Sequence, residues 1–152
     1  MKLRTAADAA VRQPPLPDSP VISVFFGGAD DPGDLGLLKV AVPAGAGMPP
    51  HRHHGSDVIL IPVAGFVRIV KGEEAIDVYP GDAAFIDKDE AVSLTNPGNQ
   101  DAQVFVAAGP TSFVRTVLAW AAVDAATEDL AGKAPDAADE ADQAAEPVAE
   151  AS

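Results

Sequence analysis

The stretch Gly45-Ala46-Gly47-Met48-Pro49-Pro50-His51-Arg52-His53-His54 holds all three histidines of this 152-residue chain. His51 and His53 are two residues apart, and on an extended strand such residues project from the same face. Because imidazole is a common ligand of transition metals, the pair has the spacing of half a metal site. His54 is out of phase with this pair and is expected in a solvent-facing loop. Any further ligand must come from elsewhere in the fold.

Composition divides the chain into three parts, with one domain expected from its length. Residues 1–20 end in a proline-rich run, which predicts an extended N-terminal arm. Residues 21–122 contain the predicted core. Residues 123–152 are mostly Ala, Asp, Glu, Gln and Pro, which predicts a disordered acidic tail.

The charge of the chain argues against a nucleic-acid partner. The formal net charge is −13, of which −8 falls from residue 124 onward. Nucleic-acid binding depends on clustered Lys and Arg, and the ten basic residues here are scattered. The chain also lacks the ~18 consecutive apolar residues of a membrane span and the apolar core of a signal peptide. The sequence therefore predicts a cytoplasmic protein with no membrane partner.

Short apolar runs separated by turn residues predict an all-β fold for the central part. The expected strands are 21–26, 35–42, 51–53, 58–63, 66–70, 75–79, 83–86, 92–95 and 103–107. After Pro110, the spacing of Phe113, Val114, Val117 and Leu118 predicts one short helix. The run 58–63 has no polar face, so both of its sides should be covered, and we expect a homodimer.

The placement of Gly45, His51-Arg52-His53 and Gly65, followed by Pro80-Gly81-Asp82 and Asn96, resembles the two sequence motifs of the cupin superfamily. The resemblance covers residues 21–120. It implies a small single-domain cupin: a β-barrel of the jelly-roll, or double-stranded β-helix, type with one short C-terminal helix and flexible terminal arms.

The resemblance also implies a metal site, and here the sequence departs from the family pattern. Metal-bearing cupins use two histidines and a glutamate of the first motif and a third histidine of the second, all pointing into the barrel. Counting from Gly65 and Asn96 puts the last two positions at Val58 and Val92, so the ligand set is degenerate. A bulge that turned Asp57 inward would complete a triad with His51 and His53 for a divalent transition metal such as Zn, Fe, Mn or Ni.

Without Asp57, the barrel interior is expected to be apolar and either solid or large enough for one small ligand. The expected lining residues are Val58, Leu60, Phe85, Val92, Leu94 and Phe105.

Three functions stay open at this stage. The first is a cupin-domain protein with an incomplete two-histidine metal centre that binds a small molecule or acts as an accessory protein. The second is a mononuclear metal-dependent oxygenase, isomerase or lyase that uses His51, His53 and Asp57. The third is a structural or protein-interaction barrel. No serine lies in a Gly-x-Ser-x-Gly motif, so hydrolase chemistry is not supported.

Overall fold

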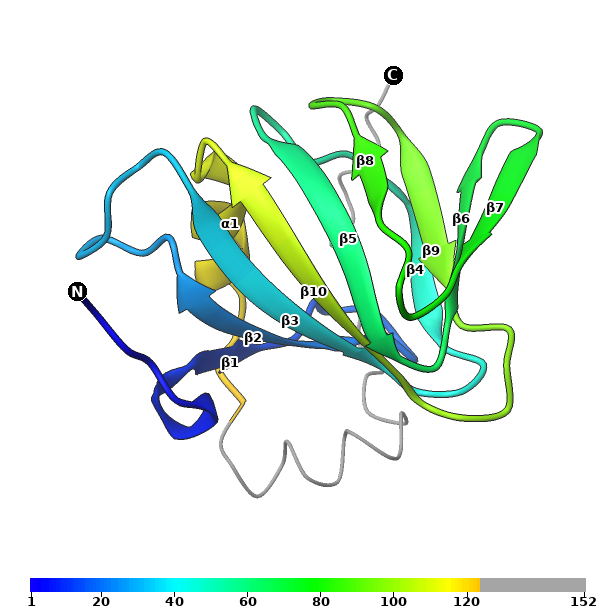
Figure 1. The fold of residues 1–152 in the computed structure, drawn as a ribbon, viewed down its shortest axis with the longest axis horizontal. Coiled ribbons are helices and arrows are strands. Elements are labelled where there is room, and N and C mark those ends of the chain that lie inside the picture. The colour runs from blue at the N-terminus through cyan, green and yellow to red at the C-terminus, as the bar shows by residue number, and fades with distance from the viewer. Residues whose placement is uncertain (124–152) are drawn as a thin grey trace.

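The computed structural model describes residues 1–123, and the predicted acidic tail lies outside them except for Val123 (Figure 1). The described residues form ten strands, one short 3-10 helix and one α-helix. The elements are η1 (Ala6–Asp8), β1 (Ala10–Arg12), β2 (Val21–Phe26), β3 (Gly36–Val42), β4 (Gly47–His51), β5 (Asp57–Ala64), β6 (Val67–Lys71), β7 (Glu74–Val78), β8 (Ala84–Ile86), β9 (Val92–Thr95), β10 (Ala102–Gly109) and α1 (Ser112–Leu118).

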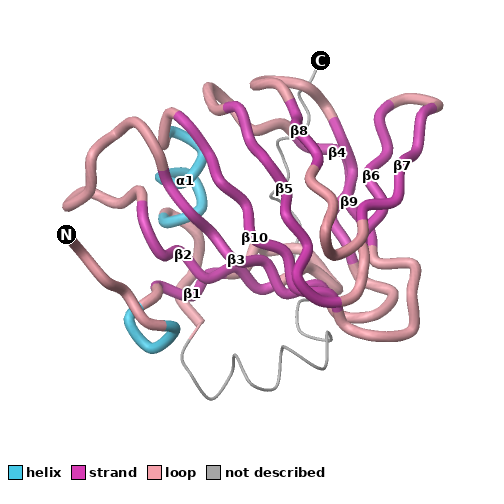
Figure 2. The backbone as a smooth tube through the Cα atoms, viewed as in Figure 1, coloured by secondary structure: helices cyan, strands magenta, loops and turns pink. Residues whose placement is uncertain are grey.

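The strands form two antiparallel sheets that face each other (Figure 2). The six-stranded sheet has the order β1-β2-β3-β10-β5-β8, and the four-stranded sheet has the order β4-β9-β6-β7. Consecutive strands pair in β1–β2–β3 and β6–β7, whereas the other neighbours are distant in sequence, as in β3–β10 and β10–β5. The prediction of an all-β, cupin-like jelly roll is confirmed. No helix among residues 1–123 is long and apolar enough to cross a membrane.

Alternation along the strands of the six-stranded sheet separates the core from the outer face. On β3, Leu38, Val40 and Val42 are buried, and their neighbours are half-buried. On β5, Val58 and Leu60 are buried, whereas Ile59, Ile61 and Val63 are exposed on the other side. Burying each inward Val or Leu stabilises the fold by ~1.5–3 kcal/mol. Within the described chain, nothing buries the outer side of β5.

Helix α1 covers the part of the six-stranded sheet that the smaller sheet does not reach, and Figure 1 shows it behind β3 and β10. Its apolar residues Val114 and Val117 are fully buried in the core. The helix can approach closely because Gly36 stands under it: a Cβ on Gly36 would lie 2.8 Å from a methyl group of Val114. The predicted helix is confirmed.

The N-terminal arm is fastened to the barrel, contrary to the expectation of a flexible extension. The sequence did not predict β1, which pairs with β2. The buried carboxylate of Asp31 accepts hydrogen bonds from Lys2 Nζ at 2.6 Å and Arg4 Nη1 at 2.8 Å. The backbone N–H of Gly27 also donates to it, at 2.9 Å. These contacts hold the pKa of Asp31 well below its usual range, with the Arg4 bond the largest cause.

Asn96 joins the two sheets where β9 ends. Its amide Nδ2 donates to the carbonyl oxygen of Val42, the last residue of β3, at 2.9 Å, and to that of Gln100 at 2.7 Å. Its Oδ1 accepts from the backbone N–H of Gly98 at 2.9 Å. Because Asn96 is almost fully buried, these bonds replace the water it loses. The motif asparagine is therefore a structural residue.

Candidate functional site

His51 and His53 lie together at the end of β4, and His53 contacts α1. His51 is opposite Val92 of β9, after a bulge that begins at Met48. The strand thus ends at His51, whereas we expected residues 51–53 to be extended. The two imidazole rings still meet edge to face, with centroids 4.9 Å apart, and Phe113 of α1 packs on His53 at 4.6 Å.

Burial keeps both imidazoles neutral near pH 7. Desolvation is the main cause that lowers the pKa of His53 to about 3, and the charges of His51 and His54 lower it further. Desolvation also lowers the pKa of His51, against a hydrogen bond to the carbonyl oxygen of Pro49. That bond joins His51 Nδ1 to the carbonyl at 3.0 Å, so Nδ1 carries the proton and Nε2 is the acceptor.

His53 has one nitrogen with unused bonding capacity. The residue is 6% exposed, and its Nδ1 has no hydrogen-bond partner among the described residues. Leaving such a group unpaired costs ~1–3 kcal/mol. A ligand or a metal ion that bonded to this nitrogen would remove that cost.

The two degenerate ligand positions point into the barrel, as the family pattern implies. Val58 is 1% exposed and Val92 is 3% exposed. Each stands on a strand whose outward neighbours are more accessible. The positions that hold Glu and the third His in metal-bearing cupins are therefore filled by apolar side chains here.

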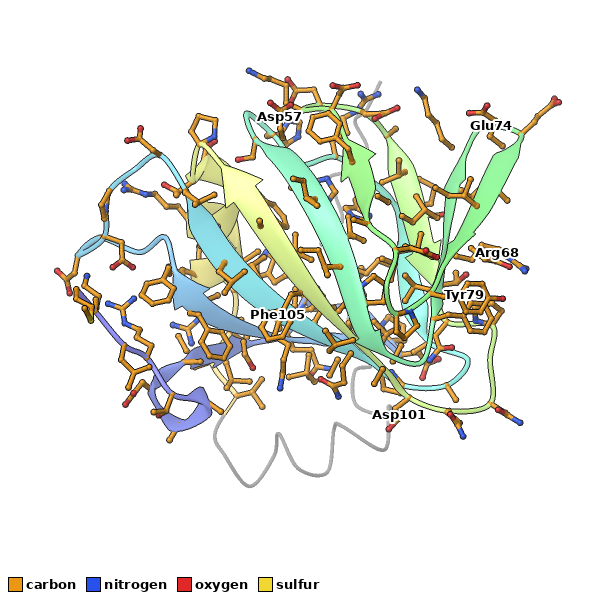
Figure 3. The ribbon with its side chains drawn as sticks, viewed as in Figure 1. Asp57, Arg68, Glu74, Tyr79, Asp101 and Phe105 are labelled. Carbon is orange, nitrogen blue, oxygen red and sulfur yellow. The ribbon has the colours of Figure 1, made fainter. Side chains whose placement is uncertain are left out.

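Asp57 does not replace either missing ligand, which corrects the triad hypothesis. It shares the outer face of β5 with Ile59, and its Oδ1 accepts a hydrogen bond from the backbone N–H of Lys88 at 2.9 Å. Figure 3 shows it at the start of β5. β5 has no bulge between Asp57 and Val58, so strand alternation sends their side chains to opposite faces. Among residues 1–123, no three His, Asp or Glu side chains are grouped so as to hold a metal ion.

Four of the six residues expected to line the interior do face inward. Val58, Leu60 and Val92 are buried, and Leu94 packs against the core. Phe85 and Phe105 do not face the interior, because both side chains point to the outer face of the six-stranded sheet, and Phe85 lies instead at the rim of the hollow described below. Phe85 is 57% exposed, and the rings of Phe105 and Phe25 lie with their centroids 6.2 Å apart. Phe105 is labelled in Figure 3.

A small hollow opens between the edge strands β7 and β8 and extends to Val92. Its volume is about 170 Å³. Ile69, Ile86 and Val92 contribute apolar side chains to it, and Lys71 and Glu90 form an ion pair at its edge. This ion pair raises the pKa of Lys71 and lowers that of Glu90. Sequence reasoning missed the ion pair, because the two residues lie 19 positions apart and no motif connects them.

Comparison with known families agrees with this architecture. The family model for the cupin domain matches residues 38–108, which include both histidines, Val58 and Val92. Residues 38–108 therefore form a cupin domain. This cupin keeps the histidine pair of the first motif and lacks the other two ligands.

Solved structures show the same fold. The polyketide cyclase RemF from Streptomyces resistomycificus has a TM-score of 0.61 and 20% identity, over 72% of this chain and 79% of that one. The Schizosaccharomyces pombe Cnp3 cupin domain has a TM-score of 0.54 and 11% identity, over 64% and 65%. A cupin domain of an XRE family transcriptional regulator from Enterobacter cloacae has a TM-score of 0.52 and 13% identity, over 59% and 95%.

These identities are below 25%, so they establish the fold and not the activity. This chain covers slightly less than two thirds of the Cnp3 domain. No curated protein matches the chain by sequence.

Proposed function

We propose that this cupin binds a small, mainly apolar molecule in its barrel, next to an incomplete two-histidine metal centre. The observation that carries the proposal is the pair of buried valines, Val58 and Val92, at the two missing ligand positions. Tight transition-metal sites have three or four protein ligands, and the described residues offer two imidazoles. The donor set therefore does not fit a tightly held metal, and no reaction step is derived through one.

The hollow between β7 and β8 supports the ligand part of the proposal. Its volume of about 170 Å³ suits a molecule of roughly one ring, since apolar cavities of ~150 Å³ accept benzene. The side chain of Val92 lines it, and His51 is the cross-strand neighbour of Val92. A bound molecule would rest its apolar part on Ile69 and Ile86 and direct a polar group toward Lys71 and Glu90, which also line the hollow.

Metal analysis of untagged protein tests the incomplete centre. We expect far less than one Zn, Fe, Mn or Ni per chain. Near-stoichiometric metal that is lost in His51→Ala or His53→Ala would overturn the proposal. A gain-of-ligand variant gives the positive control: Val58→Glu with Val92→His should bind Zn²⁺ much more tightly than the wild type, and adding His51→Ala should abolish that gain.

Phenol, an apolar ring with one hydroxyl group, is the probe for ligand binding. We expect saturable chemical-shift changes in the NMR spectrum of the wild type, centred on residues of the hollow. Ala84 lines the hollow, so Ala84→Leu should fill it and weaken phenol binding at least tenfold. Glu73→Ala, in the β6–β7 turn, is a matched control that should bind phenol normally. Absence of saturable binding to the wild type, or unchanged binding to Ala84→Leu, would refute the ligand proposal.

A further inference from the structure

The hollow between β7 and β8 carries its charged residues on one part of its lining. They are Lys71, Glu74 and Glu90, so one ammonium group stands against two carboxylates. Lys71 ends β6 and Glu74 begins β7, and the two are paired across the hairpin. Strand alternation puts them on the same face as Ile69 and Ile76, which line the apolar part of the hollow. Figure 3 shows Glu74 beside the turn between β6 and β7.

Lys71 and Glu90 neutralise each other. The Nζ of Lys71 forms an ion pair with Oε2 of Glu90, and Oε1 of Glu90 accepts a hydrogen bond from the backbone N–H of Asp87 at 3.0 Å. Both oxygens of Glu90 are therefore in use. A ligand that bonded to Glu90 would have to displace one of these partners.

Glu74 differs from Glu90, because its carboxylate has no such partner. Among residues 1–123 it makes no hydrogen bond and no ion pair. It nevertheless lies near Lys71: the hydrogen bond to Glu90 is the main cause that raises the pKa of Lys71, and the charges of Glu74 and Asp87 raise this pKa further. One lysine thus faces three carboxylates and is already bound to one of them. The rim of the hollow therefore has an excess of negative charge.

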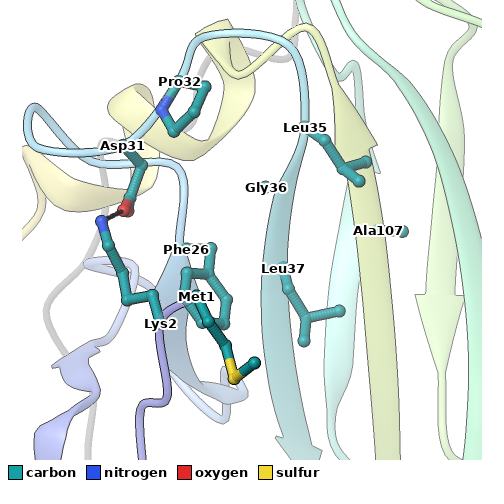
Figure 4. Close-up of a pocket in the computed structure, with 9 residues that line it drawn as sticks. All are labelled: Met1, Lys2, Phe26, Asp31, Pro32, Leu35, Gly36, Leu37 and Ala107. Atoms are coloured by element: carbon teal, nitrogen blue, oxygen red, sulfur yellow. Dashed lines mark hydrogen bonds and ion pairs between the residues drawn. The ribbon is translucent and has the colours of Figure 1, made fainter.

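A larger groove, on the outer face of the six-stranded sheet, lacks this imbalance (Figure 4). It has a volume of about 580 Å³ and is lined mainly by apolar side chains, among them Phe26, Leu35 and Leu37. Its two charged side chains, Lys2 and Asp31, form an ion pair at 2.6 Å. A charged ligand therefore gains less in this groove than in the hollow beside Glu74.

We propose that the molecule bound in the hollow is a small apolar amine, held as its ammonium ion beside Glu74. This inference rests on the proposed function and adds the charge of the ligand to it. Ile76 and Glu74 are two residues apart on β7, about 7 Å, which a single ring with an aminomethyl group can span. The ring would lie on the apolar side chains, and the charged nitrogen would donate a hydrogen bond to the carboxylate of Glu74. A carboxylate ligand would meet the excess negative charge, and a neutral ligand would gain no ion pair.

Three probes of similar size but different charge test the proposal: benzylamine, benzyl alcohol and benzoate. NMR titration of the full chain at pH 7, where benzylamine is a cation and benzoate an anion, gives the three dissociation constants. We expect benzylamine to bind about fivefold more tightly than benzyl alcohol, the upper end for one partly exposed ion pair, and benzoate to bind most weakly. In 1 M salt, where the screening length is ~3 Å, the difference between benzylamine and benzyl alcohol should nearly disappear.

Three variants test the part played by Glu74. Glu74→Gln keeps the size of the side chain and removes its charge, so the ratio of the benzyl alcohol to the benzylamine dissociation constant should fall close to one. Lys71→Gln should raise this ratio above the wild-type value, because it removes the competing cation. Glu73→Gln, in the β6–β7 turn and outside the lining, is the matched control and should keep the wild-type ratio.

The outcomes separate this inference from the proposed function. Benzylamine that binds no more tightly than benzyl alcohol would overturn the inference, and so would a ratio that Glu74→Gln leaves unchanged. Saturable binding of phenol and benzyl alcohol would then still support the proposed function. If none of the probes, phenol included, binds saturably, the proposed function fails and the choice of an amine fails with it.

Discussion

Acidification from pH 7 to pH 5 should destabilise the metal-free protein through His53. Burial lowers the pKa of His53 to about 3 in the folded chain, whereas an unfolded histidine titrates near ~6.5. Between these values the unfolded chain binds a proton that the folded chain does not bind. The stabilising contribution is therefore fully present above about pH 6.5 and declines as the pH falls toward about 3.

The expected magnitude follows from proton linkage. Between pH 7 and pH 5 the difference in bound protons integrates to about 1.4 pH units, and each unit is worth ~1.36 kcal/mol, so His53 alone contributes about 2 kcal/mol. His51 acts in the same direction, since its pKa is also lowered. Asp31 and Glu90 contribute little in this range, because their lowered folded pKa values and the unfolded values of ~3.9 and ~4.3 all lie below pH 5.

Urea unfolding in the presence of EDTA, at pH 5, 6 and 7, measures this effect through the linearly extrapolated free energy of unfolding. His53→Gln should remove about 2 kcal/mol of the pH dependence. His54→Gln, which replaces an exposed imidazole near Asp89, is the control and should keep it. A wild-type free energy that changes by less than about 0.5 kcal/mol from pH 7 to pH 5 would refute the reasoning. A His53→Gln variant whose free energy of unfolding depends on pH as strongly as that of the wild type would also refute it.

Three further predictions concern stability. Asn96→Leu removes three hydrogen bonds and should destabilise the chain by about 2–4 kcal/mol in urea unfolding; a loss below about 1 kcal/mol would contradict its joining role. Asp31→Asn should lower the free energy of unfolding by about 1–3 kcal/mol and accelerate tryptic cleavage after Arg4. Unchanged cleavage would show that contacts other than those of Asp31 hold the N-terminal arm. Gly65→Ala should lower the melting temperature more than Gly72→Ala does. Both glycines have positive φ, but only at Gly65 would an added Cβ meet the backbone, 2.7 Å from the carbonyl oxygen of Asp101. Equal melting temperatures of the two variants would exclude this contact as a cause.

Strands and turns were predictable because their signals are local. Gly65 and Gly81 do adopt positive φ at the predicted turns, and Asp82 accepts the backbone N–H of Tyr79 at 3.1 Å. The predicted runs 21–26 and 92–95 coincide with β2 and β9. These features depend on residues a few positions apart, which hydrophobic periodicity and turn chemistry capture.

Hydrophobicity alone did not predict which side chains of a strand point into the core and which point to the outer face. The strand with Val104, Phe105 and Val106 is apolar on both faces, so no polar residue shows which face is inward. The same holds for Phe85, between Ala84 and Ile86. Register decides the question, and register depends on pairing with β3 and β5, far away in the chain.

Strand β1 was missed for a related reason. Three residues, Ala10-Val11-Arg12, carry too little periodicity to predict a strand. The segment is held by its pairing with β2 and by the contacts of Lys2 and Arg4 with Asp31, all of which are tertiary. The proline-rich segment 13–20 that follows therefore did not prevent residues 10–12 from pairing with β2.

The junction at Asn96 also bears on how a guest molecule could reach the interior. There the last residue of β3 and the end of β9 are tied by one amide, so the two sheets cannot slide past each other at that point. β7 and β8, by contrast, pair only with β6 and β5 in the part of the chain that the structure describes. Breathing of the barrel should thus concentrate along the β7 and β8 edges, and amide hydrogen exchange should be faster there than at the Asn96 junction.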